Sequence, residues 1–487
     1  MSFGDVELLV AFLPVVWAVH WLLPRRAGAQ NAWLLAASWL FYFTWHPRLV
    51  LLFAANTVVT WVVVRRLAPG APGRSRAWLI AGIAWSFGLL GVLKYAGFFA
   101  GGLAAMLGAV GLSVSAPTLE LVVPIGISFW TLQVVGAMLD IWWGRAAAPS
   151  GWLPWATFVS FFPQLMAGPI PRAGQLLVQL EAPRALSADR VARGGATFLG
   201  GFVLTYLVAA TLGPGLVDPV FAHPLHYGAL AHWAAILGYA GQVFSDFAGY
   251  SLMAIGCGRL LSLELPENFR QPFLAKNLME LWRRWHITLN QWLFDFLYTP
   301  AITGRGRLRG RYDLAFLLVF GFSGLWHGAA LTFVVWGLLH GVGLAVHRRF
   351  DEHVRGLCRK DRVWVARRRS RGWAMWSWAL TMGFFVMTLV PFRAQSLGAA
   401  GTFAAGLLGL NGADGIHFDT AVAKFNLLVC VGILVAMHAL ALGRLPALRE
   451  RAAALPSPVR GVAWGLVVVY LLLFMPVASG TFIYAQF

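Results

Sequence analysis

Long apolar runs recur from one end of this 487-residue chain to the other, and 59% of its residues are hydrophobic against 12% charged. A helix needs roughly 20 apolar residues to cross a bilayer, and several runs approach or exceed that length. Inside lipid a chain must satisfy its own backbone hydrogen bonds, and a helix does so. A β-barrel is excluded, because its strands would alternate in polarity. We therefore expect an all-α polytopic membrane protein.

The net charge of +19 is carried mainly by short loops between the apolar runs. Residues 348–371 hold nine arginines and Lys360 against three acidic residues. Basic loops of this kind are typical of the cytoplasmic side of a membrane protein. The positive charge therefore indicates membrane orientation, and we expect no nucleic-acid partner.

The two ends of the chain are expected outside the cytoplasm. Asp5 and Glu7 precede the first apolar run, whereas Arg25 and Arg26 follow it. This order predicts a retained first helix with an outer N-terminus, not a cleaved signal peptide. Counting crossings from there places the C-terminal Phe487 outside as well.

No metal site is expected. Cys257, Cys358 and Cys430 lie too far apart in sequence for a paired thiolate motif. His223 and His226 are three residues apart, but no third ligand follows at a helical spacing. Phosphate-loop and dinucleotide-binding motifs are also missing from the sequence.

Residues 314–347 form an apolar segment with a polar centre, residues 322–328, that contains His327 between two glycines. Basic stretches lie on both sides, at residues 305–311 and 348–371, so the segment is expected to enter and return on one side. This predicts a re-entrant or broken pair of helices with His327 near its tip. A histidine at membrane depth is costly unless it faces a polar cavity. From this segment alone, a functional histidine and a packing histidine remain equal alternatives.

A second histidine lies in a stretch that is both polar and aromatic, residues 262–311. At helical spacing, one face carries an apolar stripe and another carries polar residues, while Glu280 and Arg284 are placed to pair. The stripe consists of Trp285, Leu289, Trp292 and Phe296, and the polar face of Arg283, His286 and Asn290. An amphipathic helix at the membrane interface explains the pattern without any chemistry. His286 and His327 are nevertheless the two histidines set among aromatic residues with polar neighbours, whereas His340 is assigned to ordinary packing.

Four motifs in the middle of the chain resemble those of membrane-bound O-acyltransferases, most of all the bacterial branch that acts in O-acetylation of alginate and related polysaccharides. They are residues 245–251 (SDFAGYS), 265–269 (LPENF), 282–286 (WRRWH) and 326–328 (WHG). The last six residues, 482–487, agree with this branch as well.

The resemblance implies a ring of roughly a dozen transmembrane, re-entrant and interfacial helices around a thinned centre. It implies one integral-membrane domain, residues 1–487, with the catalytic core in residues 244–347. His327 is expected to be the active-site histidine and His286 a second functional histidine. The residues expected to bind substrate or support the site are Asn290, Arg283, Trp326, Asp246, Tyr250 and Ser323. Ser323 also provides an alternative nucleophile, although no acidic residue lies near it in sequence.

The expected activity is transfer of an acyl group, in the first place acetyl, from a cytoplasmic acetyl-CoA-type thioester across a bacterial inner membrane, for O-acetylation of an exported polysaccharide such as alginate. An imidazole with an ordinary pKa near 6.5 is suited to remove the proton of a sugar hydroxyl as it attacks the thioester. No bound cofactor is expected, and the partners are membrane lipid, the acyl donor, and a polysaccharide or an extracytoplasmic acetyltransferase. The alternatives are a polysaccharide exporter or flippase, and a non-catalytic scaffold for extracytoplasmic enzymes.

Overall fold

The computed structural model describes residues 11–45, 47–112, 123–165, 167–411, 421–440, 451 and 454–474. The predicted outer positions of the two ends, and the motif at residues 482–487, lie outside these ranges. Within them, the regular secondary structure is helical.

Five helical stretches are long and apolar enough to cross a membrane, which confirms the prediction of an all-α polytopic membrane protein. Shorter apolar helices accompany them. The five stretches are Pro47–Leu67, Arg76–Ala109, Ala188–Ala222, Leu331–Lys360 and Arg371–Arg393.

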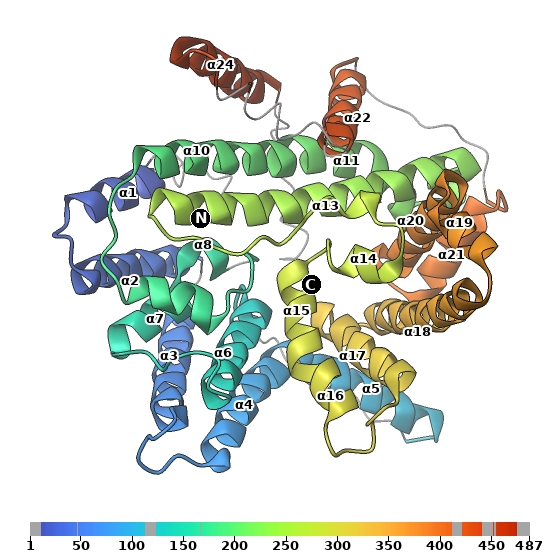
Figure 1. The fold of residues 1–487 in the computed structure, drawn as a ribbon. Coiled ribbons are helices and arrows are strands. Elements are labelled where there is room, and N and C mark those ends of the chain that lie inside the picture. The colour runs from blue at the N-terminus through green and yellow to red at the C-terminus, as the bar shows by residue number, and fades with distance from the viewer. Residues whose placement is uncertain are drawn as a thin grey trace. The chain divides into compact units, whose positions relative to one another are not determined.

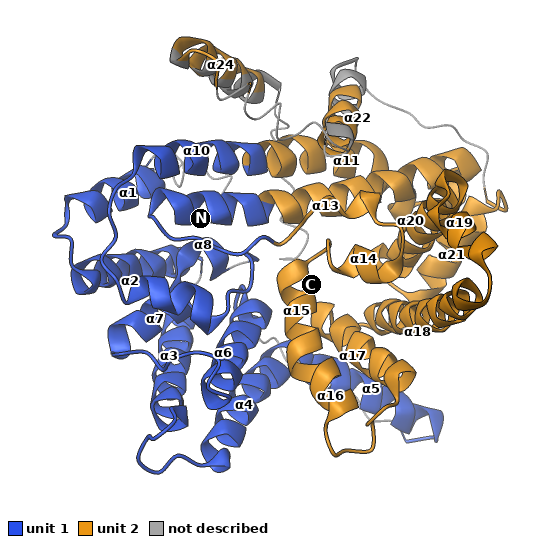
Figure 2. Ribbon diagram, in the orientation of Figure 1, with its two compact units in different colours: residues 1–201, 250–267, 487 blue, residues 202–249, 268–486 orange. Residues whose placement is uncertain are grey.

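The chain divides into two compact units (Figure 2), of which the first comprises residues 1–201, 250–267 and 487. Two side-chain amides on one helix, Ala27–Phe43, stabilise a loop of this unit: Gln30 donates to the carbonyl of Arg184 at 3.0 Å and Asn31 to that of Leu180 at 2.8 Å. The helices that begin in this unit are α1 (Leu13–Leu22), α2 (Ala27–Phe43), α3 (Pro47–Leu67), α4 (Arg76–Leu90), α5 (Ala96–Ala109), α6 (Ile127–Trp142), α7 (Trp152–Ser160), α8 (Phe162–Leu165), α9 (Val178–Leu180) and α10 (Ala188–Phe202).

The second unit comprises residues 202–249 and 268–486 and contains both histidines of interest. Helix α13 (Ala229–Leu260) belongs partly to each unit, so the expectation of one domain over residues 1–487 with a core at 244–347 stays a prediction. The other helices that begin here are α11 (Ala210–Leu212), α12 (Asp218–Ala222), α14 (Leu278–Trp282), α15 (Ile287–Leu293), α16 (Thr299–Thr303), α17 (Tyr312–His327), α18 (Leu331–Lys360), α19 (Arg362–Arg369), α20 (Arg371–Arg393), α21 (Leu397–Leu407), α22 (Ala421–Leu440) and α24 (Ser457–Phe474).

Helices α17 and α18 form a hairpin (Figure 1). Their backbones approach closely at two glycines. A Cβ atom on Gly324 would lie 2.2 Å from the carbonyl oxygen of Phe333, and one on Gly337 would lie 2.1 Å from that of Phe320. Small residues permit such close approach of helices in a membrane, where van der Waals packing holds them together. We call these contacts the glycine seam.

The opposite end of the same hairpin is held by charge. Asp313, in the first turn of α17, accepts from Arg348 at 2.8 Å and from Arg349 at 2.7 Å, both on α18. The two basic stretches therefore lie at the same end, and His327, the last residue of α17, lies at the other. The structure thus confirms a broken pair of helices with His327 at the tip, and entry and return on one side of the membrane stay a prediction.

The prediction of one continuous amphipathic helix around His286 is wrong. α14 ends at Trp282, His286 has a φ of 43°, and α15 begins only at Ile287. The aromatic stripe also does not face the surroundings of the protein, because Trp285 and Trp292 are buried. The predicted pair is confirmed between Glu280 of α14 and Arg284, two residues after this helix ends, since Arg284 Nη2 lies 2.7 Å from Glu280 Oε1.

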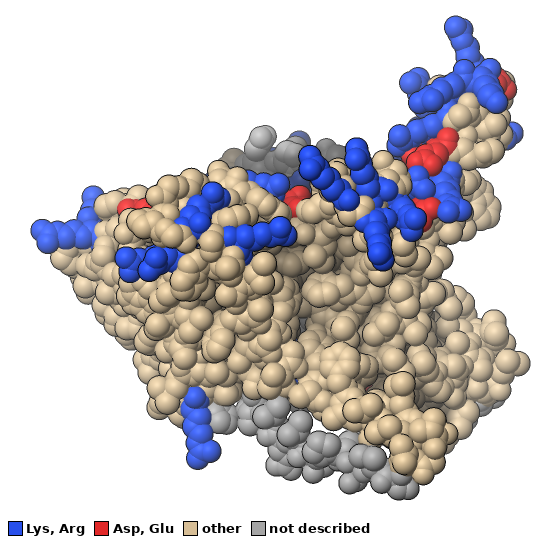
Figure 3. Space-filling view, turned by 90° about the horizontal axis from the view of Figure 1, so that it is seen from below, with Lys and Arg blue, Asp and Glu red and all other residues tan. Residues whose placement is uncertain are grey.

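Charged side chains occupy only part of the surface. Figure 3 shows Lys and Arg side chains gathered together with a few Asp and Glu among them, whereas most of the surface in view is uncharged. An uncharged surface is what a chain surrounded by lipid requires.

Candidate active site

His286 is positioned by a break in the chain and by one side-chain amide. Its left-handed backbone turns the chain from α14 into α15, and its imidazole is 1% exposed. Nδ1 of His286 lies 3.0 Å from Oδ1 of Asn268. The same oxygen accepts from the backbone N–H of Thr288 at 3.3 Å and from its hydroxyl at 2.9 Å. Asn268 therefore fixes both the turn and the ring.

These contacts define the tautomer of a neutral His286. Because Asn268 Oδ1 accepts from a backbone N–H, the atom facing His286 is the oxygen, and Nδ1 must supply the hydrogen. The lone pair of the neutral ring then lies on Nε2. A histidine held in this way presents Nε2 as a proton acceptor.

Aromatic rings surround His286. Phe247 of α13 meets it edge-on, with ring centroids 4.6 Å apart, and Phe269 stacks beside it at 6.5 Å. The indole of Trp326 lies 6.2 Å away. The motifs at residues 245–251 and 265–269 thus meet at one histidine, although they are far apart in sequence.

His327 lies in the same aromatic cluster. It is 4% exposed, and its ring lies 5.0 Å from Trp326, 5.0 Å from Trp336 and 5.4 Å from Phe392. Since Trp326 contacts the rings of both His286 and His327, the structure brings the two predicted histidines to one place. Trp326 itself joins the pair.

The other predicted site residues differ in how they relate to this cluster. Asn290 lies one turn beyond His286, whose carbonyl accepts from its backbone N–H at 3.0 Å. Ser323 is buried one turn before His327, and among the described residues its hydroxyl has no hydrogen-bond partner. No hydrogen bond therefore links Ser323 to His327 as a nucleophile and base would be linked.

Asp246, Tyr250 and Arg283 lie on two different elements, the first two on α13 and Arg283 directly after α14. Asp246 and Tyr250 are buried on α13, on either side of the ring contact that Phe247 makes. Arg283 is exposed and does not share a face with His286 and Asn290, because the chain breaks between them. This part of the predicted polar face is wrong.

Two further residues lie beside the histidines, of which Asn268 was not singled out from the sequence. Asn268 was quoted only as part of the LPENF motif, and its contact with His286 spans 18 residues. His340 was assigned to packing, and it is completely buried with its Nε2 3.0 Å from the hydroxyl of Thr388. Its ring also contacts Trp282 and Trp336, each at 4.9 Å. The four-residue spacing of Trp336 and His340 on an apolar helix was the available signal.

Among the described residues, His, Cys, Asp and Glu side chains nowhere group in threes as a metal site would need. What His286 and His327 can supply, as buried imidazoles among aromatic rings, is proton transfer in surroundings that exclude water. Such surroundings strengthen any hydrogen bond made to a reacting group.

Comparison with known proteins identifies the class. Residues 149–390 match the membrane-bound O-acyltransferase family, and this range holds His286, His327 and the whole α17–α18 hairpin. The chain belongs to this family and is an O-acyltransferase.

The relatives indicate its branch. The chain is 34% identical to the probable alginate O-acetylase AlgI of Pseudomonas aeruginosa over 447 residues, which cover 89% of this chain and 82% of that protein. It is 36% identical to the Azotobacter vinelandii protein of the same name, over 72% of this chain and 69% of that one. It is also 31% identical to a peptidoglycan O-acetyltransferase of Helicobacter pylori, over 87% of this chain and 83% of the relative.

Proposed function

We propose that this protein moves an acetyl group from a cytoplasmic acetyl-CoA-type thioester across a bacterial inner membrane, for O-acetylation of an exported polysaccharide such as alginate. The observation that carries the proposal is the pair of buried histidines, His286 and His327, joined by Trp326. Both lie in the segment that matches the family, and three relatives are named for O-acetylation of alginate or peptidoglycan.

In the proposed reaction His327 is the general base. Its imidazole takes the proton of an acceptor hydroxyl while the hydroxyl oxygen attacks the thioester carbonyl. The new C–O ester bond forms, the C–S bond breaks, and the thiolate leaves and receives a proton. General-base assistance of this kind contributes about 10²–10⁴-fold to the rate.

His286 has the complementary role of orienting the reacting groups. With Nδ1–H donated to Asn268, its Nε2 is suited to accept a hydrogen bond from a hydroxyl. It would stabilise a developing oxyanion only after gaining a proton. For that oxyanion we assign the side-chain amide of Asn290 as a neutral donor, since its backbone N–H already bonds the His286 carbonyl one turn earlier.

The charged end of the α17–α18 hairpin supports a cytoplasmic donor. The arginine-rich stretch at residues 348–371 follows the positive-inside pattern and lies at the end away from His327. The acyl group would then be delivered toward the membrane interior, and both chain ends would lie outside. Direct transfer is favoured over an acyl-serine, because no hydrogen bond links Ser323 to His327.

The test uses the full chain in proteoliposomes, with acetyl-CoA labelled in its acetyl group on the side of the basic loops. Alginate oligosaccharide, alone or with an extracytoplasmic acetyltransferase, is supplied on the other side. His327→Ala should lower transfer of label by about 10²-fold or more. His353→Ala is the matched control, because it removes an exposed histidine from the basic stretch.

Full activity of His327→Ala would refute its role as base. Movement of oligosaccharide without transfer of label would favour the exporter, and label transfer by the partner enzyme without this chain would favour the scaffold. Loss of transfer in Ser323→Ala at normal expression would restore the acyl-serine route.

A further inference from the structure

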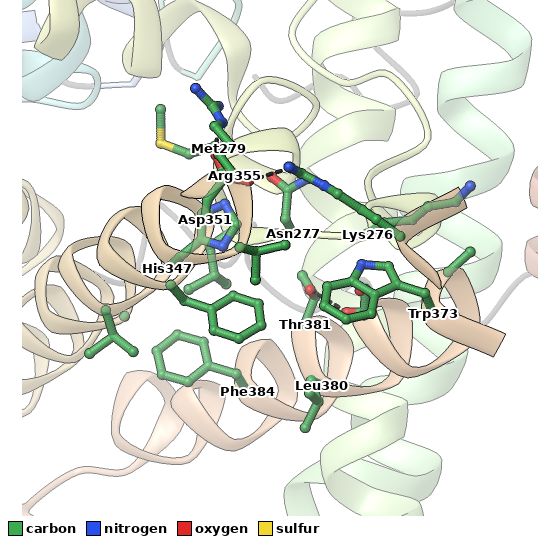
Figure 4. A pocket seen from close by; sticks show the side chains of 18 of the residues that line it. Lys276, Asn277, Met279, His347, Asp351, Arg355, Trp373, Leu380, Thr381 and Phe384 are labelled. Carbon is green, nitrogen blue, oxygen red and sulfur yellow. Dashed lines mark hydrogen bonds and ion pairs between the residues drawn. The ribbon is translucent and has the colours of Figure 1, made fainter. Parts of the chain in front are cut away.

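A pocket of about 860 Å³ opens on the second unit between α14, α18, α19 and α20 (Figure 4), and neither His286 nor His327 lines it. Its volume lies within the range of roughly 300–1,000 Å³ that is usual for ligand sites. The proposed acyl transfer makes no use of it.

One side of the pocket is basic. Five cationic side chains line it against a single carboxylate, Asp351; they are Lys276, Arg283, Arg355, Arg368 and Arg369. Asp351 is already paired with Arg355 and Arg368. In the described part of the chain, the charged groups of Lys276, Arg283 and Arg369 have no hydrogen-bond or ion-pair partner. The pocket therefore has an excess of positive charge.

The other side is apolar and lies on two of the membrane-spanning stretches. Val346 of α18 is 61% exposed and Leu380 of α20 is 71% exposed, although both are hydrophobic. Gly343 closes the floor between them, since a Cβ there would lie 2.7 Å from the ring of Phe384. Figure 4 shows Leu380 and Phe384 on the opposite side from Arg355, Asn277 and Lys276.

A basic rim above an exposed apolar floor on spanning helices requires an amphiphile with an anionic head. Basic pockets between transmembrane helices on the cytoplasmic side bind the head groups of anionic lipids. Trp373 lines the pocket as well, and indoles are enriched where a protein meets the membrane interface. We propose that this pocket is a binding site for an anionic phospholipid, with its phosphate on Lys276 and Arg369 and an acyl chain along Val346 and Leu380.

Such a lipid would have a structural consequence near the active site. The pocket is lined by Asn277, Leu278 and Met279 of the α14 turn, which ends four residues before His286. A bound lipid would hold this turn against α18 and α20. The proposal does not depend on the acyl-transfer function, and its test requires no activity.

The experiment measures retention of phosphatidylglycerol and phosphatidylcholine by the purified full chain in a neutral detergent, using native mass spectrometry. Wild type should retain phosphatidylglycerol in preference to phosphatidylcholine. The double variant Lys276→Gln/Arg369→Gln should weaken phosphatidylglycerol binding about 25-fold, since each cation near a lipid surface contributes about fivefold.

The matched control is Lys360→Gln/Arg362→Gln, which removes the same charge from exposed positions of the same basic stretch outside the pocket. It should leave retention almost unchanged. A second variant, Leu380→Trp, fills the apolar side and should weaken lipid binding with all cations in place. If the double variant fails to fold, lipid retention by Leu380→Trp still tests whether the pocket binds the lipid.

Equal retention of the two lipids would overturn the proposal, as would an equal loss in the control variant. Displacement of phosphatidylglycerol by inorganic phosphate or by coenzyme A at comparable concentrations would assign the basic rim to a soluble phosphate instead. Unchanged lipid retention in Leu380→Trp would remove the acyl-chain part of the site.

Discussion

The two ends of the α17–α18 hairpin are held together by opposite means. At one end, Asp313 bonds Arg348 and Arg349 across the helices. Toward the other, Gly324 and Gly337 bring the backbones into contact without any charge, and His327 follows directly. The end that carries the candidate base is thus held by close packing of the two backbones, without ion pairs among the described residues.

The difference shows what a buried catalytic histidine requires. Ion pairs near His327 would be expensive to desolvate and would bias its charge state. Backbone contact through glycines fixes the position of the imidazole without placing a charged group beside it. Its protonation state can then change during the reaction. At the exposed end water screens the charges, so ion pairs cost little there and also contribute little.

Of the changes that test this comparison, Gly337→Leu should lower the stability of the protein most. A side chain at Gly337 would meet the carbonyl oxygen of Phe320, a backbone atom that cannot move aside. Overpacking of this kind costs about 1–3 kcal/mol, and this position should reach the upper end. Thermal unfolding in detergent measures the loss. Gly356→Leu, on the same helix with nothing within 4 Å, is the control. Equal stability of the two variants would show that the glycine seam does not hold the hairpin.

Asn268→Ala should lower stability by an intermediate amount. It tests whether hydrogen bonds, in addition to close packing, hold the uncharged region around His286. It leaves His286 Nδ1 and the Thr288 N–H without their described acceptor, at a cost of about 1–3 kcal/mol. Acyl transfer should fall further than stability predicts, because Nε2 is no longer defined as the acceptor. Asn277→Ala, which removes only the cap of α14, should cost about 1 kcal/mol and spare the rate per folded molecule. Equal transfer rates per folded molecule would count against a positioning role for Asn268.

Asp313→Asn at the charged end should have the smallest effect, about 0–1 kcal/mol at neutral pH. Burial of Asp313 opposes ionisation, but hydrogen bonds from Arg349 and Arg348 outweigh it and lower the pKa of this carboxyl. A carboxyl with a lowered pKa stabilises the fold above its unfolded pKa, near 3.9, and loses that contribution as pH falls through the folded value.

Unfolding of wild type and Asp313→Asn should therefore differ at pH 7 and converge at a pH below about 4. Arg362→Gln, in the same basic stretch but outside this pairing, should follow wild type at every pH. A difference between wild type and Asp313→Asn that persists in acid would show that the carboxylate is not what joins the helices there.

The hairpin was predictable because its signals are local. The length of the apolar segment, the charge of its flanking loops and the position of His327 are all found within residues 305–371. The structure has a hairpin there with the basic stretches at one end and His327 at the other. The second histidine, His286, was predicted to be functional from the resemblance to a known family. Each of these predictions depends on neighbours in sequence or on short motifs.

The break at His286 was not predictable from periodicity. Trp285, Leu289 and Trp292 fit a helical spacing even though α14 and α15 are separate helices. The turn between them is set by Asn268, whose carbonyl accepts from Ile287 at 2.8 Å and whose side chain accepts from Thr288. A contact between residues about 20 positions apart cannot be detected from hydrophobic periodicity, which reports only on neighbours within a few helical turns of 3.6 residues each.

The short connection of the α17–α18 hairpin has a consequence for how the protein folds. Three residues separate the helices, so little loop entropy opposes their pairing, and a local contact of this kind forms early. His286 is placed only when Asn268 and the more distant Phe247 arrive. The chain would therefore carry its candidate base, His327, on an element that forms early, and the surrounding cluster would be completed only when the rest of the chain has folded.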